Sequence, residues 1–424
     1  MSTPRLPSLA SWLADRRWYA GQADPAPVTE QRVELPTTPP LTVVVATTAA
    51  GDRYQLVART NARPKAHDAA DEPRTALALA RFVAEEGAAG EAGARVAGHA
   101  VPGAPAVGRG TSHPIGGEQS NTSVVVGGTH VLKVLRRLQP GANPEVEVGR
   151  HLAAVAARGR PVPVAALAGW YDLDDPDGPT TLGVLHELVP GALDAWALVL
   201  SALAGDPDGL LPRLHHLGRA VAALHDALAE PGTEPEADAF GAHPLDAERV
   251  RTVAAGIGTD EPAAAALAER LAAQLGDDLG AAIRHHGDLH LGQVVLGPDG
   301  WVVLDFEGEP NRPVAERRRP HSPLRDVAGM LRSFAYAAAT HRRSEGRRLA
   351  PGWEPAARAA FLDGYLSTVD PAILPASAAA TSALLRLFEL EKVVYEVGYE
   401  RSHRPDWVDV PLEGLHLLLG EEPA

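Results

Sequence analysis

The stretch of this chain that most restricts its fold runs from residue 286 to residue 307 and reads HGDLHLGQVVLGPDGWVVLDFE. Asp288 stands five residues before the amide Gln293, and Asp305 follows twelve residues after Gln293, at the end of a short apolar run. The intervening Gly297-Pro298-Asp299-Gly300 has the composition of a tight turn and predicts a hairpin. Such a hairpin brings Gln293 and Asp305 to neighbouring strand ends, where both can face one metal ion.

The order acid, amide, acid is the arrangement that kinases of the protein-kinase type use for phosphoryl transfer. In those enzymes the first Asp accepts or orients a hydroxyl proton, and the amide and the second Asp hold magnesium on the nucleotide phosphates. An isolated His-Gly-Asp would equally suit a simple turn, and Asp305 alone would suit a cap at a strand end. The complete set favours the catalytic interpretation. We therefore predict Asp288 as the catalytic residue, Gln293 and Asp305 as Mg²⁺ ligands, and ATP as the co-substrate.

A second segment has the features of a phosphate-binding hairpin. A polar, Gly-containing turn over residues 116–123 runs into a β-branched strand, and Lys133 lies within the apolar alternation of the following strand. A half-buried Lys is rare without a partner, and a kinase small lobe places such a Lys on the phosphates. A solvated Lys on an edge strand is the alternative. The nucleotide-binding residues predicted in the turn are Ser120, Asn121, Thr122 and Ser123.

The next predicted helix is expected to supply the acid that holds Lys133. Asn143 can cap this helix, and Pro144 suits its first position. Both Glu145 and Glu147 are candidates for the acid. An acid in the first turn also complements the helix dipole, and we assign Glu145 that simpler role.

The last predicted helix, residues 384–400, carries two rows of side chains at four-residue spacing. One row is Glu391, Tyr395 and Tyr399, and the other is Lys392, Glu396 and Glu400. Arg-Pro-Asp-Trp follows at 404–407. Flat aromatic faces beside fixed acids and an Arg suit a sugar, whereas ordinary i,i+4 pairing is the alternative. The predicted substrate-binding residues are His290, Tyr395, Glu396, Tyr399, Arg404 and Trp407.

Three residues are predicted to support this chemistry without performing it. Ser322 and Pro323 begin a helix, and Asp326 in its first turn is expected to complement the dipole and to bond the catalytic loop. Glu307 follows Asp305 closely enough to support the metal site indirectly. The supporting set is His286, Glu307 and Asp326.

Composition restricts the class of protein. The 424 residues include 39 Lys and Arg against 54 Asp and Glu, a formal net charge of −15, which argues against nucleic acid or an anionic membrane as the main partner. The absence of Cys excludes disulfides, zinc–thiolate sites and thiol catalysis. The N-terminal segment lacks the apolar core of a signal peptide, and no apolar run of membrane-spanning length occurs, so we expect a cytoplasmic protein.

Element patterns divide the chain into three predicted parts. Residues 1–95 form an N-terminal cap, residues 96–190 a β-rich small lobe with its hinge, and residues 191–424 a mainly helical large lobe. The Gly-, Ala- and Pro-rich segment 87–110 marks the first boundary. The expected fold class is α+β: a bilobal protein-kinase-like fold with an N-terminal α/β cap subdomain. Predicted strands are 41–47 and 54–59, and predicted helices are 76–86, 196–203, 210–228 and 262–275.

These segments resemble maltokinases, sugar kinases related to aminoglycoside phosphotransferases. The resemblance rests on RWYAG at 17–21, EQSNTS at 118–123, KVLRR at 133–137, HGDLHLGQ at 286–293, DFEGEP at 305–310, SPLRDVAGM at 322–330, YEVGYE at 395–400 and RPDW at 404–407. It implies an ATP-dependent enzyme that phosphorylates the anomeric hydroxyl of maltose, giving maltose 1-phosphate for α-glucan and glycogen synthesis. It also implies that Glu147 holds Lys133, and that maltose lies against the segment from Tyr395 to Trp407.

Two alternatives to maltose phosphorylation remain. A kinase of glucosamine, another amino sugar or an aminoglycoside would need acids that converge on an ammonium group, which Glu396 and Glu400 could supply. A non-catalytic pseudokinase would usually lack the catalytic Asp, the metal ligands or the Lys, all of which are present here. The resemblance further suggests a trehalose-converting enzyme as a partner.

Overall fold

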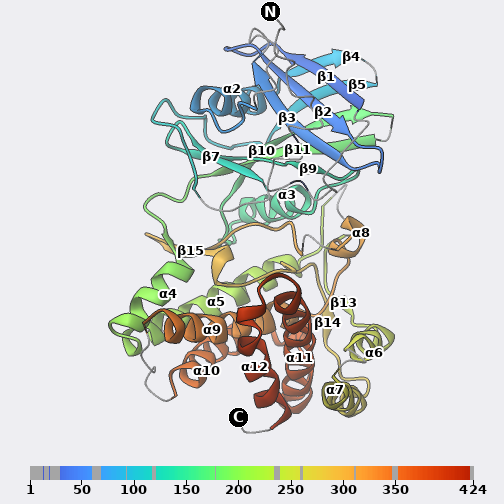
Figure 1. Cartoon of the computed structure of the whole chain (residues 1–424), viewed down its shortest axis with the longest axis vertical. Helices are drawn as coiled ribbons and strands as arrows, with labels where there is room; N and C mark the ends of the chain where they lie inside the picture. Colours follow the sequence, from blue (N-terminus) through green and yellow to red (C-terminus); the bar gives the residue numbers. More distant parts are fainter. Residues whose placement is uncertain are drawn as a thin grey trace, which may run out of the picture. The chain divides into compact units, whose positions relative to one another are not determined.

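The computed structural model describes residues 13, 19, 29–59, 68–91, 93–116, 121–176, 178–233, 239–257, 261–309, 312–345 and 352–420. The chain forms two compact units: unit 1 comprises Met1–Arg150 with Ala165–Pro190, and unit 2 comprises His151–Val164 with Gly191–Ala424. Strands dominate the first and helices the second, as Figure 1 shows, so the expected α+β class is confirmed. The expected boundary at residue 95 lies inside a strand of unit 1, and a separate N-terminal cap stays a prediction.

Unit 1 consists mainly of antiparallel strands. Among the residues that the structure describes, one sheet has the order β4-β5-β10-β11-β8-β7-β6 and another the order β1-β2-β3-β9. The strands are β1 (Thr29–Leu35), β2 (Leu41–Thr47), β3 (Arg53–Arg59), β4 (Ala88–Glu91), β5 (Ala94–Ala100), β6 (His113–Pro114), β7 (Thr122–Val126), β8 (His130–Val134), β9 (Arg137–Leu138), β10 (Leu167–Asp175) and β11 (Gly178–Glu187).

The register of the larger sheet positions the predicted phosphate-binding Lys. Strand β8 lies between β7 and β11, and Lys133 pairs with Ser123 on one side and with Val184 on the other. Lys133 is half-buried within this sheet. The alternative of a solvated Lys on an edge strand is therefore wrong, because β8 has a hydrogen-bonded neighbour on both sides.

A buried polar junction joins the two sheets of unit 1. The amide nitrogen of Gln55, on β3, donates to the carbonyl oxygens of Leu135 (2.8 Å) and Leu182 (2.6 Å), and the Tyr171 hydroxyl donates to its amide oxygen. Gln55 has no exposed surface, so each of these bonds is formed away from water. Burial is the main cause that raises the pKa of the Tyr171 hydroxyl, which keeps it a neutral donor.

The apolar core of unit 1 lies under helix α2 (Pro73–Ala84). Its buried residues Leu79, Phe82 and Val83 follow helical spacing and pack with the valines and leucines of both sheets. In the N-terminal segment, Leu13 is fully buried against β2 and β3, and the ring of Tyr19 lies 5.2 Å from that of Tyr54. These two residues of the N-terminal segment therefore pack onto the smaller sheet. The neighbouring residues 14–18 lie outside the described part.

Unit 2 consists mainly of helices. Helix α3 (Pro144–Ala157) begins in unit 1 and ends in unit 2. The other elements of unit 2 are β12 (Leu193–Asp194), α4 (Ala195–Ala204), η1 (Asp208–Leu210), α5 (Leu211–Leu228), β13 (His243–Pro244), α6 (Ala247–Gly256), α7 (Pro262–Leu275), β14 (Ala281–Ala282), η2 (Leu291–Gln293), β15 (Val294–Gly297), β16 (Gly300–Val303), α8 (Val314–Arg317), α9 (Leu324–Glu345), α10 (Trp353–Leu366), η3 (Pro371–Ile373), α11 (Ala378–His403), η4 (Pro405–Trp407) and α12 (Asp409–Leu419).

Helices α5 and α10 pack closely through a reciprocal pair of glycines. A Cβ atom on Gly218 would collide with the backbone of Phe361 and Tyr365, and one on Gly364 would collide with the carbonyl group of His215. The missing side chains therefore let the two backbones touch. The pairing positions His225, on α5, next to Tyr365, on α10. The Nδ1 atom of His225 lies 2.9 Å from the hydroxyl oxygen of Tyr365.

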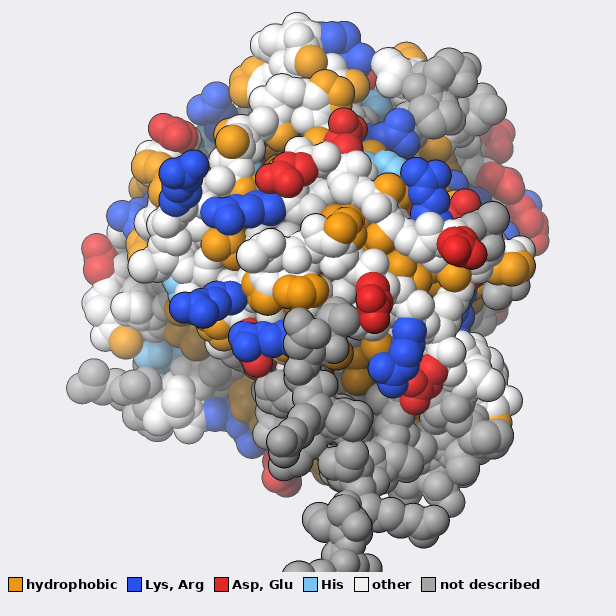
Figure 2. Space-filling model, turned by 90° about the horizontal axis from the view of Figure 1, so that it is seen from above, with side chains coloured by type: hydrophobic (Ala, Val, Ile, Leu, Met, Phe, Trp, Pro, Cys, Tyr) orange, Lys and Arg blue, Asp and Glu red, His pale blue; other side chains and the backbone are white. Residues whose placement is uncertain are grey.

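The surface mixes charges of both signs. On the described part of the face in Figure 2, basic and acidic side chains are interspersed with hydrophobic ones.

None of the described helices combines the length and the apolar character needed to cross a membrane.

We predict that Gly364→Ala destabilises the protein by about 1–3 kcal/mol, because the added methyl group forces apart two packed backbones. Gly256→Ala, at the exposed end of α6, is the matched control. Its methyl group meets no atom within 4 Å, so its free energy of unfolding should stay the same or rise by up to about 1 kcal/mol. Urea unfolding of both variants measures the difference, and equal effects would contradict the packing argument.

Candidate active site

The loop that carries Asp288 is held to the strand end beside it by the ring of His286. The Nε2 atom of His286 donates to the carbonyl oxygen of Leu304 at 2.8 Å, and its Nδ1 atom accepts from the backbone amide of Asp288 at 3.2 Å. Gly287 between them adopts a φ of +84°, a conformation that favours glycine. These contacts fix the backbone that leads into Asp288.

The carboxylate of Asp326 anchors the same loop from helix α9. Its Oδ2 and Oδ1 atoms accept the backbone amides of His286 (2.7 Å) and Gly287 (2.9 Å), and the Nε2 atom of His225 lies 3.1 Å from Oδ2. Asp326 is 1% exposed. Burial opposes its ionisation, but the hydrogen bond and charge of His225 outweigh burial and hold the pKa of Asp326 well below its usual range. An ionised carboxylate with these donors is a rigid support.

Helix α9 lies directly against the catalytic loop. A Cβ atom on Gly329 would lie 2.6 Å from the carbonyl oxygen of Leu289, so only glycine permits this approach. The hydroxyl of Ser333 accepts the backbone amide of Leu291 at 2.9 Å. His290 caps η2 through its Nδ1 atom, which accepts the amide of Gly292 at 3.0 Å, and burial lowers its pKa. The ring of His290, predicted to bind substrate, thus has a structural partner.

The predicted metal ligands meet at the hairpin β15–β16. Val294 pairs with Val303 in this hairpin, so Gln293, just before β15, and Asp305, just after β16, lie at the same open end. The amide nitrogen of Gln293 lies 3.3 Å from Oδ2 of Asp305. Asp305 has a φ of +62°, which non-glycine residues seldom adopt and which is frequent at functional sites. A carboxylate beside an amide is a set of hard oxygen donors that suits Mg²⁺. Glu307 follows on the same segment, and its carbonyl oxygen accepts Arg317 at 2.8 Å.

In unit 1, Lys133 is held by an acid other than the one expected. Its Nζ atom lies 3.0 Å from Oε2 of Glu145, whose Oε1 atom lies 3.0 Å from Nε2 of His186. Glu145 is 2% exposed, and burial raises its pKa, but the charges and hydrogen bonds of Lys133 and His186 reverse that shift and lower it to about 2. The assignment of Glu147 as the partner is thus corrected to Glu145. Helical spacing alone did not decide between the two.

The last residues of the predicted phosphate-binding segment contact Arg136. Oδ1 of Asn121 accepts the backbone amide of Arg136 at 3.2 Å, and the hydroxyl of Thr122 accepts its guanidinium nitrogens at 2.7 and 2.9 Å. Asp68 pairs with the same buried guanidinium at 2.5 Å. The side chains of Asn121 and Thr122 therefore bind Arg136, and Ser123, next to Thr122 on β7, lies beside Lys133. Ser120 lies outside the described residues.

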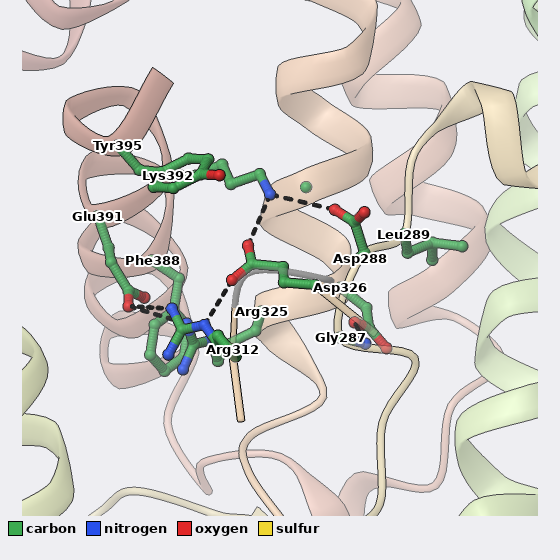
Figure 3. A pocket seen from close by; sticks show the side chains of 12 residues that line it. Gly287, Asp288, Leu289, Arg312, Arg325, Asp326, Phe388, Glu391, Lys392 and Tyr395 are labelled. Atoms are coloured by element: carbon green, nitrogen blue, oxygen red, sulfur yellow. Dashed lines mark hydrogen bonds and ion pairs between the residues drawn. The ribbon is translucent and has the colours of Figure 1, made fainter. Parts of the chain in front are cut away.

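A small cavity opens beside Asp288 within unit 2. Figure 3 shows its lining: Asp288 from the catalytic loop, Arg325 from α9, and Phe388, Lys392 and Tyr395 from α11. Its free volume is about 40 Å³, enough for one or two waters.

The charged side chains around this cavity form an alternating network. Lys392 Nζ lies 2.9 Å from Glu309 and 3.3 Å from Asp288, and Glu309 also accepts Arg312 at 2.5 Å. Glu391 lies 3.7 Å from Arg312 and accepts a hydrogen bond from Arg325 at 2.8 Å. Burial opposes ionisation of Glu309, but Lys392 and then Arg312 lower its pKa to about 2.

Among the predicted sugar-binding residues, Tyr395 lines this cavity. Tyr395 and Tyr399 are 44% and 38% exposed and stack with centroids 6.3 Å apart. The Arg404 guanidinium lies over both Tyr399 and Trp407, at 5.9 and 5.6 Å. Glu396, by contrast, is buried and accepts two hydrogen bonds from Arg332 at 2.9 and 3.0 Å, as in ordinary helix–helix pairing.

Sequence reasoning assigned no role in the site to the residues that give the cavity its charge, namely Lys392, Glu309, Arg312 and Arg325. Lys392 was recognised only as a member of one row of side chains on the last helix. Glu309, Arg312 and Arg325 come from other segments. Only the tertiary structure brings them to Lys392.

The sequence is similar to that of known phosphotransferases. A profile of the phosphotransferase enzyme family matches residues 111–374. A glucosamine kinase of Mycolicibacterium smegmatis is 33% identical over 327 residues, covering 73% of this chain and 79% of that protein. A glucosamine kinase of Streptacidiphilus jiangxiensis is 32% identical over 323 residues, covering 72% of each chain.

Solved structures show the same fold. A glucosamine kinase in complex with glucosamine, ADP and inorganic phosphate superposes with a TM-score of 0.67 at 23% identity, covering 98% of this chain and 100% of that chain. A second crystal form of glucosamine kinase gives 0.66 at 24% identity with the same coverage. The expected protein-kinase-like fold is confirmed, whereas the relatives carry a different sugar in their name from the maltose expected here.

We predict that Glu145→Gln raises the KM for ATP or lowers kcat about 10- to 100-fold, because a charge-assisted hydrogen bond to Lys133 is lost. Glu147→Gln, two residues away on the same helix, is the comparison variant and should change both values less than Glu145→Gln, because Glu145 is the acid 3.0 Å from Lys133. Steady-state kinetics with varied ATP measures both. A larger effect of Glu147→Gln would restore the original assignment.

Proposed function

This chain belongs to the phosphotransferase enzyme family, and from that premise we propose that it transfers the γ-phosphoryl group of ATP to a hydroxyl group of a small sugar. Membership makes it an ATP-dependent phosphotransferase with a hydroxyl acceptor. The observation that carries the proposal is the carboxylate of Asp288. It follows two residues whose backbone amides are bound by Asp326, and it lines a cavity with polar and aromatic walls.

Asp288 acts on the acceptor. Its carboxylate accepts or orients the proton of the sugar hydroxyl while that oxygen attacks the phosphorus atom in line with the leaving oxygen. The backbone contacts of His286 and Asp326 keep the carboxylate in place, so positioning supplies much of the rate enhancement.

Gln293 and Asp305 hold Mg²⁺, and Lys133, oriented by Glu145, binds the nucleotide phosphates. Bound magnesium neutralises charge on the phosphates. The positive φ of Asp305 and its contact with Gln293 support the first assignment, and the Lys133–Glu145 pair supports the second. Glu307, two residues after Asp305, supports this segment through the hydrogen bond that its carbonyl oxygen accepts from Arg317.

Glucosamine is the first candidate acceptor. Two relatives of that name align over nearly three quarters of the chain, at 33% and 32% identity.

Maltose is the second candidate, favoured by the aromatic series that leaves the cavity along α11. Tyr395 lines the cavity and Tyr399 stacks beside it, which extends an apolar surface for a second sugar ring. In that case the product is maltose 1-phosphate for α-glucan synthesis, and a trehalose-converting enzyme is the partner to test. We retain the cytoplasm as the proposed compartment.

The deciding measurement is an ADP-release assay with Mg²⁺ and ATP on glucosamine, maltose, glucose and kanamycin. We expect the highest kcat/KM on glucosamine. Turnover on maltose alone, with phosphate on the anomeric carbon, would select the second candidate. Absence of ADP release with every sugar would overturn the proposal.

We predict that Asp288→Asn lowers kcat by about 10²- to 10⁴-fold, the range for loss of a general base, while nucleotide binding persists. Asp305→Ala should abolish Mg²⁺-dependent turnover because it removes the charged metal ligand. Asp299→Asn, in the exposed turn of the same hairpin, is the control and should keep the activity. Retained turnover in Asp305→Ala would refute the metal assignment.

A further inference from the structure

Lys392 occupies a position that the proposed reaction does not require. Its ammonium group lies between the carboxylates of Asp288 and Glu309, at 3.3 and 2.9 Å, and the stem of the side chain comes from α11 (Figure 3). The side chain is 26% exposed, so water competes weakly for these contacts. Burial opposes its charge, but Glu309 and Asp288 hold the pKa of Lys392 above its usual range.

The cations around the cavity balance its acids. Four acids line it, but Asp326 is bonded to His225 and to backbone amides, which leaves Asp288, Glu309 and Glu391. The three cations that line it are Lys392, Arg312 and Arg325. Arg312 also pairs with Glu309, and Arg325 with Glu391. For Asp288, Lys392 is therefore the cation that compensates its charge in this cavity.

A carboxylate without its cation binds an ammonium group more strongly than a hydroxyl group, because the hydrogen bond is then charge-assisted on both sides. An amino sugar that placed its ammonium group on Asp288 would hold no hydroxyl there and would not react. We propose that Lys392 fills this ammonium position, so that the catalytic carboxylate receives hydroxyl groups and rejects ammonium groups.

This role makes Lys392 a positioning residue for the acceptor. The contact of Lys392 with Asp288 does not depend on the proposed function. Its effect on how a sugar is oriented does rest on the proposed sugar kinase activity. If glucosamine is the acceptor, Lys392 directs a hydroxyl group and not the amino group to Asp288. If maltose is the acceptor, Lys392 excludes amino sugars as non-productive competitors.

The first test measures ammonium binding without any turnover. Lys392→Ala removes the cation and leaves space for propylammonium, which supplies the missing carbons and charge. We expect propylammonium to raise the Tm of Lys392→Ala, with propanol at the same concentration as the uncharged control. Wild type and Lys392→Arg, which both keep a cation on α11, should show no such rise. Adding Glu309→Gln to Lys392→Ala should reduce the rise, because one of the two carboxylates is lost.

The second test separates positioning from a merely structural role. In Lys392→Met, glucosamine should bind non-productively, so that its KM and kcat both fall by about tenfold relative to those for glucose, while Lys392→Arg keeps the wild-type ratio. A general loss of structure would instead change both sugars alike.

The outcomes distinguish the two proposals. A propylammonium effect confined to Lys392→Ala supports the role of Lys392 even if no sugar is phosphorylated, a result that would overturn the proposed function alone. An equal effect on wild type, or none on Lys392→Ala, would overturn the role of Lys392 and leave sugar phosphorylation standing.

Discussion

The buried carboxylate of Asp326 is the interaction on which the catalytic loop depends. It receives two consecutive backbone amides of that loop and the imidazole of His225, so three separate segments of unit 2 meet at one ionised group. Buried charges are tolerated only when their hydrogen bonds are satisfied. The pairing of α5 with α10 through their glycines sets the place of His225, and Gly329 lets α9 approach the loop. The position of Asp288 thus follows from helix packing.

The same rule of charge compensation governs both parts of the proposed machinery. Glu145 is buried with Lys133 and His186, and Glu309 is held between Lys392 and Arg312. In each case an acid of lowered pKa fixes the cation beside it. A chain with a net charge of −15 thereby presents ordered cations where phosphate and sugar are proposed to bind.

Much of the architecture was predictable, since strongly periodic or punctuated segments follow local rules. Helix α7 has the predicted bounds, and the hairpin β15–β16 forms at the turn GPDG. Strand β10 was not predicted, because its Gly and Asp residues have low strand propensity; it forms because β5 and β11 pair with it on both sides. Likewise, α11 was predicted from its rows of side chains, but not that Glu396 turns to Arg332 in the helix interface.

By itself, the sequence predicted the phosphotransferase class and the order of the proposed reacting groups. Asp288, Gln293 and Asp305 lie close together along the chain, and a local hairpin suffices to bring the last two side by side. The tertiary structure decided which acid holds Lys133, and which cation faces Asp288. Glu145 and Glu147 both lie in the first turn of α3, and the contacts with Lys133 and with His186 on β11 identify Glu145 as the acid that holds the Lys. Lys392 lies 104 residues from Asp288, so its contact depends on how α11 packs, which no local pattern encodes.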